Sequence, residues 1–425
     1  MSRLAAIVVL ALLLIIAVAA CGGGENGRGG SAPTGSQLPL AFVRDGDIWM
    51  VNADGADERR LTDWGDVQDF DWAPGGGIMV ALRRSNIRAL GPGEERCYGP
   101  YCVRCYEPHC DPFLWPWPYY EATVITLEGE TVLEIPPVRF PYLSPDAHFA
   151  RWSPKGDLLA YAAGSSVWKI VDLQGKEVLE LSGSAPVWSP DETKVAYGRI
   201  VDGDCGELCT TPVVLDLVDG SVWEVDSLSR SAGSVAFSPD GLWLSCESTL
   251  VNVATREKRP LPGLPVSWSP DSRYLALFQG AHLGGVAIYE VERSEVACQR
   301  VSFMPPIYAD RASAFGGKWS SDGRWFVFPQ RYYEKNAGIR KTLAAAEVDT
   351  CQTHGIKSIE LEASAEVELE ISTDGRHIAY TRGVSTWAMG INGSLMPMWV
   401  VGMDGTALTE LGTGLHPRWQ AVPIP

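Results

Sequence analysis

Short apolar runs alternate with polar turns along most of this chain, and the pattern predicts β-strands. Runs such as Leu158–Tyr161, Lys194–Tyr197 and Trp325–Phe328 are aliphatic, β-branched or aromatic, as a buried strand requires. A second run follows in most units, for example Val167–Val171, and after a further turn comes a polar edge strand. Each unit therefore predicts four strands, which is the content of one propeller blade.

One turn phrase precedes these runs and recurs every few tens of residues. Its full form is an aromatic residue followed by Ser-Pro-Asp-Gly, as in Phe237–Gly241. Related copies begin at Trp72, Trp152, Trp188, Trp268, Trp319 and Ile371. Pro fixes φ, Asp hydrogen-bonds the backbone two residues on and Gly accepts a positive φ, so the phrase is a tight turn between antiparallel strands. The aromatic residue can wedge between neighbouring sheets, and a repeat of this length indicates a propeller or a solenoid.

The two ends of the repeat region predict how the ring closes. Three strands precede the first copy of the phrase, at Leu40–Val43, Ile48–Asn52 and Arg59–Thr62. A truncated copy, Pro417–Trp419, lies in a last strand at Leu415–Gln420 that has no partners of its own. Pairing of this strand with the N-terminal blade would complete an all-β propeller of eight blades. Seven blades are the alternative, if the short unit at 237–267 is not an independent blade.

The segment Leu40–Gly55, which reads LAFVRDGDIWMVNADG, resembles the repeat of the TolB-type β-propellers. Similar repeats occur in the N-terminal propeller of dipeptidyl peptidase IV-like enzymes. The resemblance covers about residues 39–425 and implies a propeller without the hydrolase domain of those enzymes. Because such repeats serve many unrelated partners, the resemblance implies little about function.

The N-terminus predicts an exported lipoprotein. A basic start at Met1–Arg3 precedes an apolar stretch at Leu4–Ala17, which is too short for a typical membrane span. The next residues, Val18–Cys21, resemble a bacterial lipobox, which implies cleavage after residue 20 and lipidation of Cys21. An uncleaved anchor, or an ordinary signal peptide with a chance cysteine, is the alternative.

These features predict three segments: a signal peptide at 1–20, a flexible Gly/Ser-rich tether at 21–38 and the propeller at 39–425. Several acyl chains on Cys21 would give firm membrane anchoring, in the periplasm or at the cell surface. The net charge of −17 opposes binding to nucleic acid or to anionic lipid. We expect a monomer that binds an envelope protein or a glycan.

Four of the ten cysteines lie in one insert at about residues 92–119, namely Cys97, Cys102, Cys105 and Cys110. Two disulfides, with three alternative pairings, would hold this insert in an oxidising compartment. The spacing of Cys102 and Cys105 would also suit a tetrahedral zinc site of four thiolates, or of three with His109. Outside the cytoplasm we favour disulfides and predict no metal.

Apart from Cys21, the remaining cysteines fall into two candidate pairs and one single thiol. A disulfide between Cys205 and Cys209 would cross-link the tip of a hairpin. Cys298 and Cys351 occupy corresponding positions near the ends of adjacent blade sequences and are the second candidate pair. Cys246 lies in an apolar run and is predicted to be an inert core thiol.

The C-terminal part of the insert alternates prolines with large aromatic residues, Trp115, Trp117, Tyr119 and Tyr120. Such a patch on a rigid scaffold is a candidate recognition surface for a protein or a glycan. The same rings could instead pack the insert onto its own propeller, and the sequence leaves both interpretations open.

No catalytic motif is present: there is no Gly-x-Ser-x-Gly elbow, no His-Glu-x-x-His and no Gly-rich phosphate loop. Acids such as Asp69 and Asp71 are interpreted as turn formers rather than as calcium ligands. We therefore expect no catalytic residue and no cofactor, and predict a non-enzymatic binding or scaffolding module at the cell envelope. The alternative is a hydrolase or lyase acting on glycans or peptides at the propeller channel, for which perturbed acids at the channel mouth would be the sign.

Overall fold

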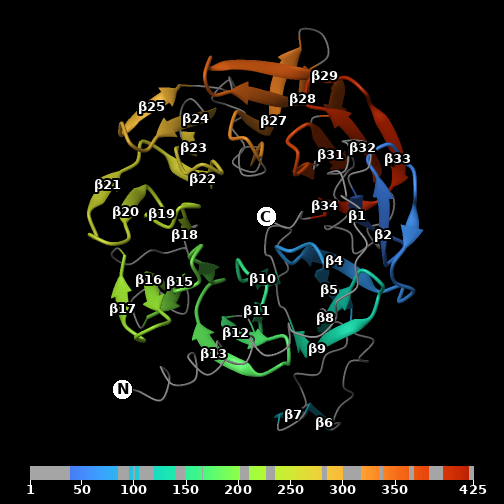
Figure 1. Cartoon of the computed structure of the whole chain (residues 1–425), viewed down its shortest axis with the longest axis vertical. Helices are drawn as coiled ribbons and strands as arrows, with labels where there is room; N and C mark the ends of the chain where they lie inside the picture. Colours follow the sequence, from blue (N-terminus) through green and yellow to red (C-terminus); the bar gives the residue numbers. More distant parts are fainter. Residues whose placement is uncertain are drawn as a thin grey trace, which may run out of the picture.

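The chain folds into eight four-stranded antiparallel sheets arranged as the blades of a ring (Figure 1). The computed structural model describes residues 39–84, 95–98, 101–104, 119–139, 149–164, 166–201, 210–225, 235–279, 285–299, 317–334, 338–362, 368–381 and 396–420. The prediction of an eight-bladed β-propeller is confirmed. No helix in these ranges is long and apolar enough to span a membrane.

Each blade has one strand at the centre of the ring and three further out (Figure 1). The innermost strands are β4 (Val67–Trp72), β10 (Ala150–Trp152), β14 (Val187–Trp188), β18 (Val235–Phe237), β22 (Leu264–Trp268), β26 (Lys318–Trp319), β30 (Leu369–Ile371) and β34 (Leu415–Trp419). The second strands are β5 (Ile78–Arg84), β11 (Leu158–Ala162), β15 (Lys194–Ile200), β19 (Trp243–Cys246), β23 (Tyr274–Gln279), β27 (Trp325–Glu334), β31 (His377–Thr381) and β1 (Pro39–Arg44).

The outer half of each blade completes the meander. The third strands are β8 (Tyr119–Thr126), β12 (Val167–Asp172), β16 (Thr210–Asp216), β20 (Thr249–Asn252), β24 (Gly285–Glu290), β28 (Gly338–Glu347), β32 (Pro397–Gly402) and β2 (Asp47–Asn52). The outermost strands are β9 (Thr131–Arg139), β13 (Glu177–Ser182), β17 (Val222–Glu224), β21 (Lys258–Pro260), β25 (Glu295–Cys298), β29 (Gln352–Glu362), β33 (Thr409–Thr413) and β3 (Arg59–Arg60).

The repeated turn phrase has the geometry that its residues predict. In the copy after β22, the Ser269 hydroxyl donates to Asp271 Oδ1 at 2.6 Å and accepts from the backbone N–H of Tyr274 at 2.8 Å. Asp271 also accepts from the backbone N–H of Arg273, two residues on, at 3.1 Å. The residue after Asp takes a positive φ, for example +73° at Gly241. The serine is buried because both capacities of its hydroxyl are used within the turn.

Apolar side chains pack between blades rather than within a single central core. One cluster combines Ile288 of β24 with Phe326 and Phe328 of β27 and Ala344 of β28, so it joins two successive blades. The other clusters follow the same plan around the ring. Each blade is therefore stabilised by its two neighbours, as in other repeat architectures.

We call the residue that opens each turn phrase the anchor, together with Trp419 in the truncated copy; it is aromatic except at Ile371. Most tryptophan anchors link their blade to the preceding one. Trp72 donates its indole N–H to the carbonyl oxygen of Arg418 at 3.3 Å, and Arg418 immediately precedes the anchor of the preceding blade. Equivalent bonds run from Trp152 to Asp71, from Trp268 to Ala236, from Trp319 to Ser267 and from Trp419 to Glu370. Among the described tryptophan anchors, only Trp188 has no such bond.

The C-terminal strand closes the ring, as predicted. Strand β34 pairs with β1 in the sheet β3-β2-β1-β34, with Leu40 opposite Trp419. Arg44 of β1 reaches the last blade and donates to the carbonyl oxygen of Thr413 at 2.8 Å. Phe42 of β1 packs in one cluster with Met398 of β32, so apolar contacts reinforce the seam. The structure shortens the expected strand at 415–420 by one residue and the expected strand at 59–62 by two.

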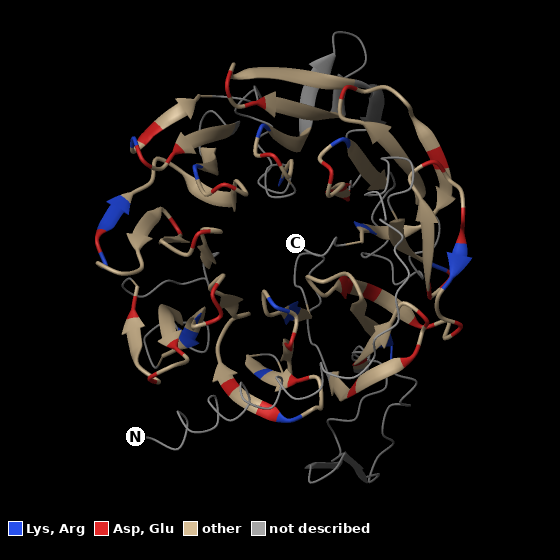
Figure 2. Cartoon of the chain, in the orientation of Figure 1, with Lys and Arg blue, Asp and Glu red and all other residues tan. Residues whose placement is uncertain are grey.

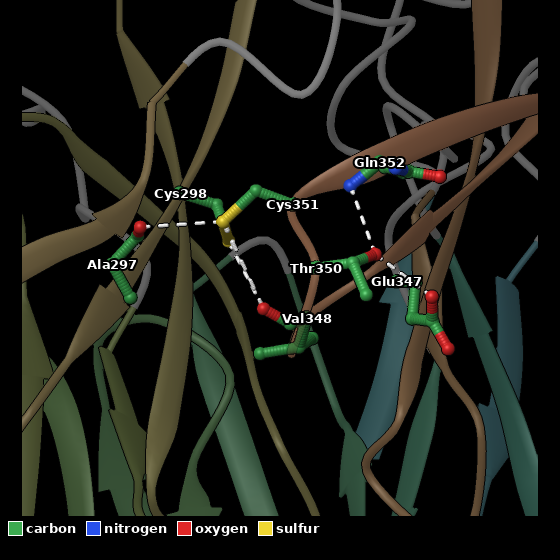
Figure 3. Close-up of a disulfide and its surroundings, with 7 residues drawn as sticks. All are labelled: Ala297, Cys298, Glu347, Val348, Thr350, Cys351 and Gln352. Carbon is green, nitrogen blue, oxygen red and sulfur yellow. Dashed lines mark hydrogen bonds between the residues drawn. A yellow bond between two sulfur atoms is a disulfide. The ribbon is translucent and has the colours of Figure 1, made fainter.

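A disulfide joins Cys298 at the end of β25 to Cys351, in the turn before β29 of the next blade (Figure 3). This is the pair that the sequence analysis placed in corresponding parts of adjacent blades. The carbonyl oxygens of Val348 and Ala297 approach the two sulfur atoms at 3.2 and 3.3 Å. Because a disulfide carries no S–H, these are close packing contacts rather than hydrogen bonds. Cys246 is a buried thiol in β19.

The described part of the insert is a two-stranded sheet of β6 (Glu95–Tyr98) and β7 (Tyr101–Arg104), in which Cys97 lies opposite Cys102 in the backbone register. Strand β8 begins at Tyr119, so the last two aromatic residues of the candidate surface belong to a blade. Tyr120 packs against the core cluster of that blade. The other candidates lie outside the described residues: Cys21, Cys105, Cys110, Trp115, Trp117, Cys205 and Cys209.

Candidate functional site

The residue that immediately precedes each anchor occupies the same position on all eight innermost strands. In ring order these residues are Lys318, Glu370, Arg418, Asp71, Arg151, Val187, Ala236 and Ser267. The first five carry charges that alternate in sign over five successive blades, whereas the last three are uncharged. We call Lys318, Glu370, Arg418, Asp71 and Arg151 the axial arc. Figure 2 shows both signs of charge at the inner edge of the ring.

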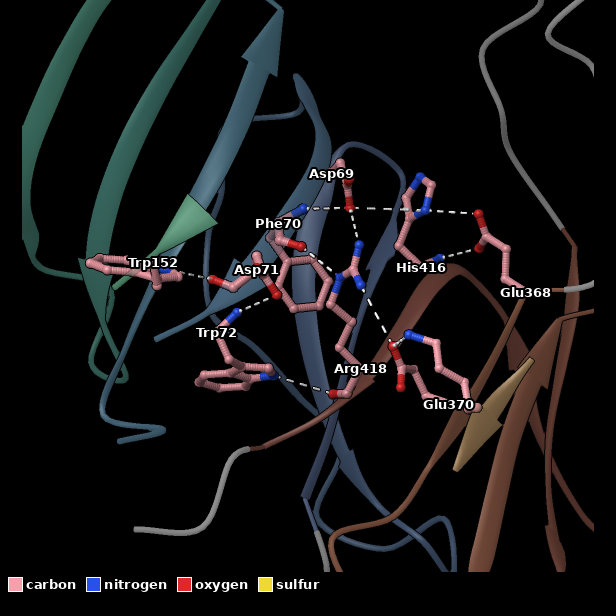
Figure 4. Close-up of polar contacts among 10 residues, drawn as sticks. Asp69, Phe70, Asp71, Trp72, Trp152, Glu368, Glu370, His416 and Arg418 are labelled. Atoms are coloured by element: carbon pink, nitrogen blue, oxygen red, sulfur yellow. Dashed lines mark hydrogen bonds and ion pairs between the residues drawn. The ribbon is translucent and has the colours of Figure 1, made fainter. Parts of the chain in front are cut away.

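Arg418 is the central member of the axial arc (Figure 4). Its guanidinium donates through Nε to the carbonyl oxygen of Phe70 at 2.7 Å and through Nη2 to Asp69 Oδ1 at 3.2 Å. Its Nη1 lies 3.7 Å from Glu370 Oε1, which is also 3.1 Å from Lys318 Nζ. Arg418 thus connects the innermost strands on both sides of β34.

His416 adds a second layer of charge beside the arc (Figure 4). Its Nδ1 lies 2.9 Å from Glu368 Oε1 and 3.9 Å from Asp69 Oδ1, and its backbone N–H donates to Glu368 Oε2 at 2.8 Å. The residue has a φ of +52° and lies where the register of β34 against β1 shifts. A bulge of this kind redirects a side chain, and here the imidazole lies between two carboxylates.

Burial and pairing set the ionisation of this network. Burial opposes the charged form of His416, but the Asp69 and Glu368 carboxylates outweigh it and raise the pKa of the imidazole to about 9. Burial likewise disfavours the charged carboxylate of Asp69, yet His416 and Arg418 hold its pKa below the usual value. His416 therefore carries a positive charge at neutral pH, and its two carboxylate neighbours are ionised.

We predict that this imidazolium makes stability fall as the pH rises from neutral to alkaline. Because folding raises the pKa of His416 from 6.5 to about 9, its contribution is complete below pH 6.5 and is lost as the pH passes through about 9. A shift of this size corresponds to about 3 kcal/mol. Solvent screening at Glu368, whose side chain is 39% exposed, lowers the expected loss to about 2 kcal/mol.

The measurement is urea unfolding at a series of pH values between 6 and 10. The His416→Gln variant should show a flatter pH dependence of the unfolding free energy, and His377→Gln, which leaves the network intact, should keep the wild-type slope. An unchanged slope in His416→Gln would show that another group causes the dependence.

Asp71 and Arg151 form the end of the arc, and their charges are offset by partners much less than those of the other members. Among the described residues, the Asp71 carboxylate accepts one hydrogen bond, from the backbone N–H of Trp72 at 3.0 Å. Burial raises the pKa of its carboxyl to about 6, although Arg418 acts in the opposite direction. Burial lowers the pKa of Arg151, which Asp71 partly restores, and no ion pair of Arg151 occurs among the described residues.

This geometry corrects one expectation from the sequence and adds two residues that the sequence did not point to. Asp69 and Asp71 lie within strand β4 and face the axial network, so they are not turn formers. The sequence analysis did not single out His416 and included Arg418 only within a truncated repeat, yet both side chains hold the network together. No group of three or more His, Cys, Asp or Glu side chains in the described ranges is arranged to hold a metal ion.

The chain is similar to several solved structures. The crystal structure of dipeptidyl peptidase 4 from Porphyromonas gingivalis matches with a TM-score of 0.50 and 10% identity, over 89% of this chain and 58% of that chain. TolB from Acinetobacter baumannii matches with a TM-score of 0.35 and 16% identity, over 71% of this chain and 79% of that one. An oligogalacturonate lyase in complex with manganese matches with a TM-score of 0.43 and 12% identity, over 90% of this chain and 86% of the lyase chain.

The first of these matches confirms the propeller fold that the repeat at residues 40–55 implies, and it concerns the fold alone. The chain spans less than two thirds of that peptidase. No protein-family model and no curated protein matches the chain.

Proposed function

We propose that this protein is a lipid-anchored propeller that binds a protein or a glycan at the cell envelope and does not catalyse a reaction. The observation that carries the proposal is the pairing of the two acids beside His416, Asp69 and Glu368. Asp69 accepts hydrogen bonds from the backbone N–H of Phe70 and from Arg418. Glu368 accepts from the backbone N–H of His416 and forms an ion pair with its imidazole. Because partners lower the pKa of both acids, neither is suited to supply a proton at neutral pH. The network instead favours a rigid, closed scaffold.

The cross-link between Cys298 and Cys351 supports a location outside the cytoplasm. Disulfides persist in oxidising compartments and are rare where thiol reductants are abundant. Such a compartment agrees with the export signal and the lipobox-like sequence at residues 1–21.

Membrane attachment is predicted to depend on the thiol of Cys21. Wild-type protein expressed in a bacterium should incorporate a labelled fatty acid and sediment with membranes. Cys21→Ser should do neither, because the acyl chains have no site of attachment. Cys246→Ser, which changes a cysteine within a blade, is the matched control and should be labelled like the wild type. Labelling of Cys21→Ser, or no labelling of the wild type, would contradict the anchor.

Partner recognition is predicted to reside in the insert. Arg84 and Tyr120 are register partners of β5 and β8, so a short Gly-Ser turn can replace residues 85–118 without changing the blade. This variant should remain folded and should lose the envelope partner that the wild type captures, because preorganised aromatic rings make effective anchors.

The double variant Trp115→Ala/Trp117→Ala keeps the rest of the insert and should weaken capture similarly. The control Trp223→Ala changes an aromatic residue on the outermost strand β17 and should leave capture unchanged. Capture that survives excision of the insert would place the binding surface on the blades.

A second candidate function is favoured by Asp71. Its pKa of about 6 is that of a group able to act as a general acid or base near neutral pH, as a hydrolase or lyase acting on glycans or peptides would require. Turnover of such a substrate by the wild type, lost in Asp71→Asn with binding retained, would establish the enzyme and reject the scaffold.

A further inference from the structure

The seam between the blade β14–β17 and the blade β18–β21 differs from the other seams of the ring. Each of the other seven seams is crossed by at least one hydrogen bond or ion pair between described residues. Between the described parts of these two blades, no hydrogen bond, ion pair or disulfide is formed. Their one polar contact is the Arg256 guanidinium, whose carbon lies 5.2 Å from the centre of the Trp223 ring.

Two devices that link other blades are missing from the residues of this seam. Its anchor is Phe237, which has no indole N–H to donate to the carbonyl oxygen of the preceding blade. The residues before the two anchors, Val187 and Ala236, bring no charge to the axis. The seam of Ile371 also lacks an indole, but there an ion pair between two members of the axial arc bridges the blades.

Apolar packing therefore holds this seam together. One cluster combines Ala196 and Val214 of the first blade with Phe237, Leu244 and Cys246 of the second. Contacts between apolar atoms act only at short range, whereas the attraction of an ion pair falls slowly with distance. Once the two blades begin to separate, no described bond draws them back. This seam is therefore expected to open before the others do.

The seam lies across the ring from one with many polar links. In ring order, the seam between β30–β33 and the blade of β34 is four seams away in both directions (Figure 1). It is crossed by contacts of His416 with Glu368, of Arg418 with Glu370, and of the Trp419 indole with a backbone carbonyl. The axial arc thus reinforces the part of the ring that the C-terminal strand closes, and it ends before the seam of β14 and β18.

We propose that the ring opens locally and reversibly at the seam between β14–β17 and β18–β21, while the seams of the axial arc stay closed. The blades themselves stay folded, because their backbone hydrogen bonds lie within each sheet. This inference goes beyond the proposed function, since it concerns a motion of the ring and holds for either candidate function.

Cys246 is a natural reporter of this opening, because its buried thiol lies in the cluster between the two blades. Ala81→Cys adds a matched reporter to the same molecule. Ala81 is fully buried at the seam between β34 and β4, and each of the two residues lies two positions after the partner of its anchor. Iodoacetamide labelling of the folded full chain is followed at both residues by peptide mass spectrometry.

Each labelling rate is divided by the rate at the same residue in concentrated urea, which removes differences in intrinsic reactivity. We expect Cys246 to be labelled at least tenfold faster than residue 81. Its rate should also depend less on added urea, because opening of one seam exposes less surface than unfolding does. Equal normalised rates with equal urea dependence would show that the seam opens only when the whole ring unfolds, and would overturn the proposal.

Phe237→Trp supplies the missing indole donor and should slow the labelling of Cys246 about fivefold, as one added hydrogen bond predicts. Val187→Glu/Ala236→Lys is a second route, which continues the alternating charges of the axial arc across the seam and should act in the same direction. Labelling at residue 81 should not change in either variant, and thermal melts verify that both are folded. Unslowed labelling of Cys246 in both folded variants would place the opening elsewhere and reject the proposal.

Discussion

Deletion of residues 414–425 is expected to abolish the cooperatively folded propeller. The deletion removes β34 and leaves β1 as an unpaired inner edge with Leu40 and Phe42, both fully buried in the intact ring, open to solvent. An exposed apolar edge strand promotes pairing between molecules, so aggregation should accompany the loss of structure. Far-ultraviolet circular dichroism, thermal melting and size-exclusion chromatography would measure both effects.

Deletion of residues 421–425 is the matched control, because it leaves β34 complete. This shorter deletion should melt close to the full-length temperature. If the longer deletion also melted there, closure by β34 would contribute little to stability, and the interblade clusters alone would hold the ring.

Arg418→Met is expected to lower the free energy of unfolding by about 3–5 kcal/mol at pH 7, because removal of one partner leaves buried charges uncompensated. Asp69 and Glu370 would both lose their contacts with the guanidinium. Arg418 also opposes the effect of burial on the carboxyl of Asp71. Guanidinium chloride unfolding at fixed salt would give the difference.

The loss should shrink as the pH falls towards 4, since protonation removes the uncompensated carboxylate charges. Arg199→Met is the control: this arginine of β15 pairs with Glu224 of the outermost strand β17, and the two side chains are 38% and 61% exposed. The substitution should therefore cost less than about 1 kcal/mol. Equal losses in the two variants, or a loss independent of pH, would contradict the role given to Arg418.

The number of blades and the closure of the ring could be predicted because both follow from local signals. A turn phrase such as Ser269–Ser272 specifies its own geometry through bonds between residues no more than five apart. Three strands precede the first turn phrase and one unpaired strand ends the chain. Together they make the four strands of one blade, so counting strands is enough to predict that they pair. Neither inference requires knowledge of which side chains meet in space.

The axial network could not be predicted in the same way. Arg418 and Asp69 are 349 residues apart in the chain, and only the closed ring brings them together. The position of His416 depends on a bulge, and the residue with the positive φ is the histidine itself rather than a glycine, so the sequence does not mark the bulge. A signal did exist: reading the residue before each anchor gives Asp71, Arg151, Lys318, Glu370 and Arg418. The alternating charges at this position become apparent only when the sequences of the blades are aligned with one another.

The entry and exit of the chain are adjacent, since the backbone N–H of Gln420 donates to the carbonyl oxygen of Pro39 at 2.9 Å. A few added residues could join these two points, and the chain could then be cut in a turn of any other blade, as a circular permutant. The order of the blades would not change, but a different blade would hold the new N-terminus. Under the proposed lipid anchor, a permutant of this kind would attach to the membrane through a different blade while its fold stays the same.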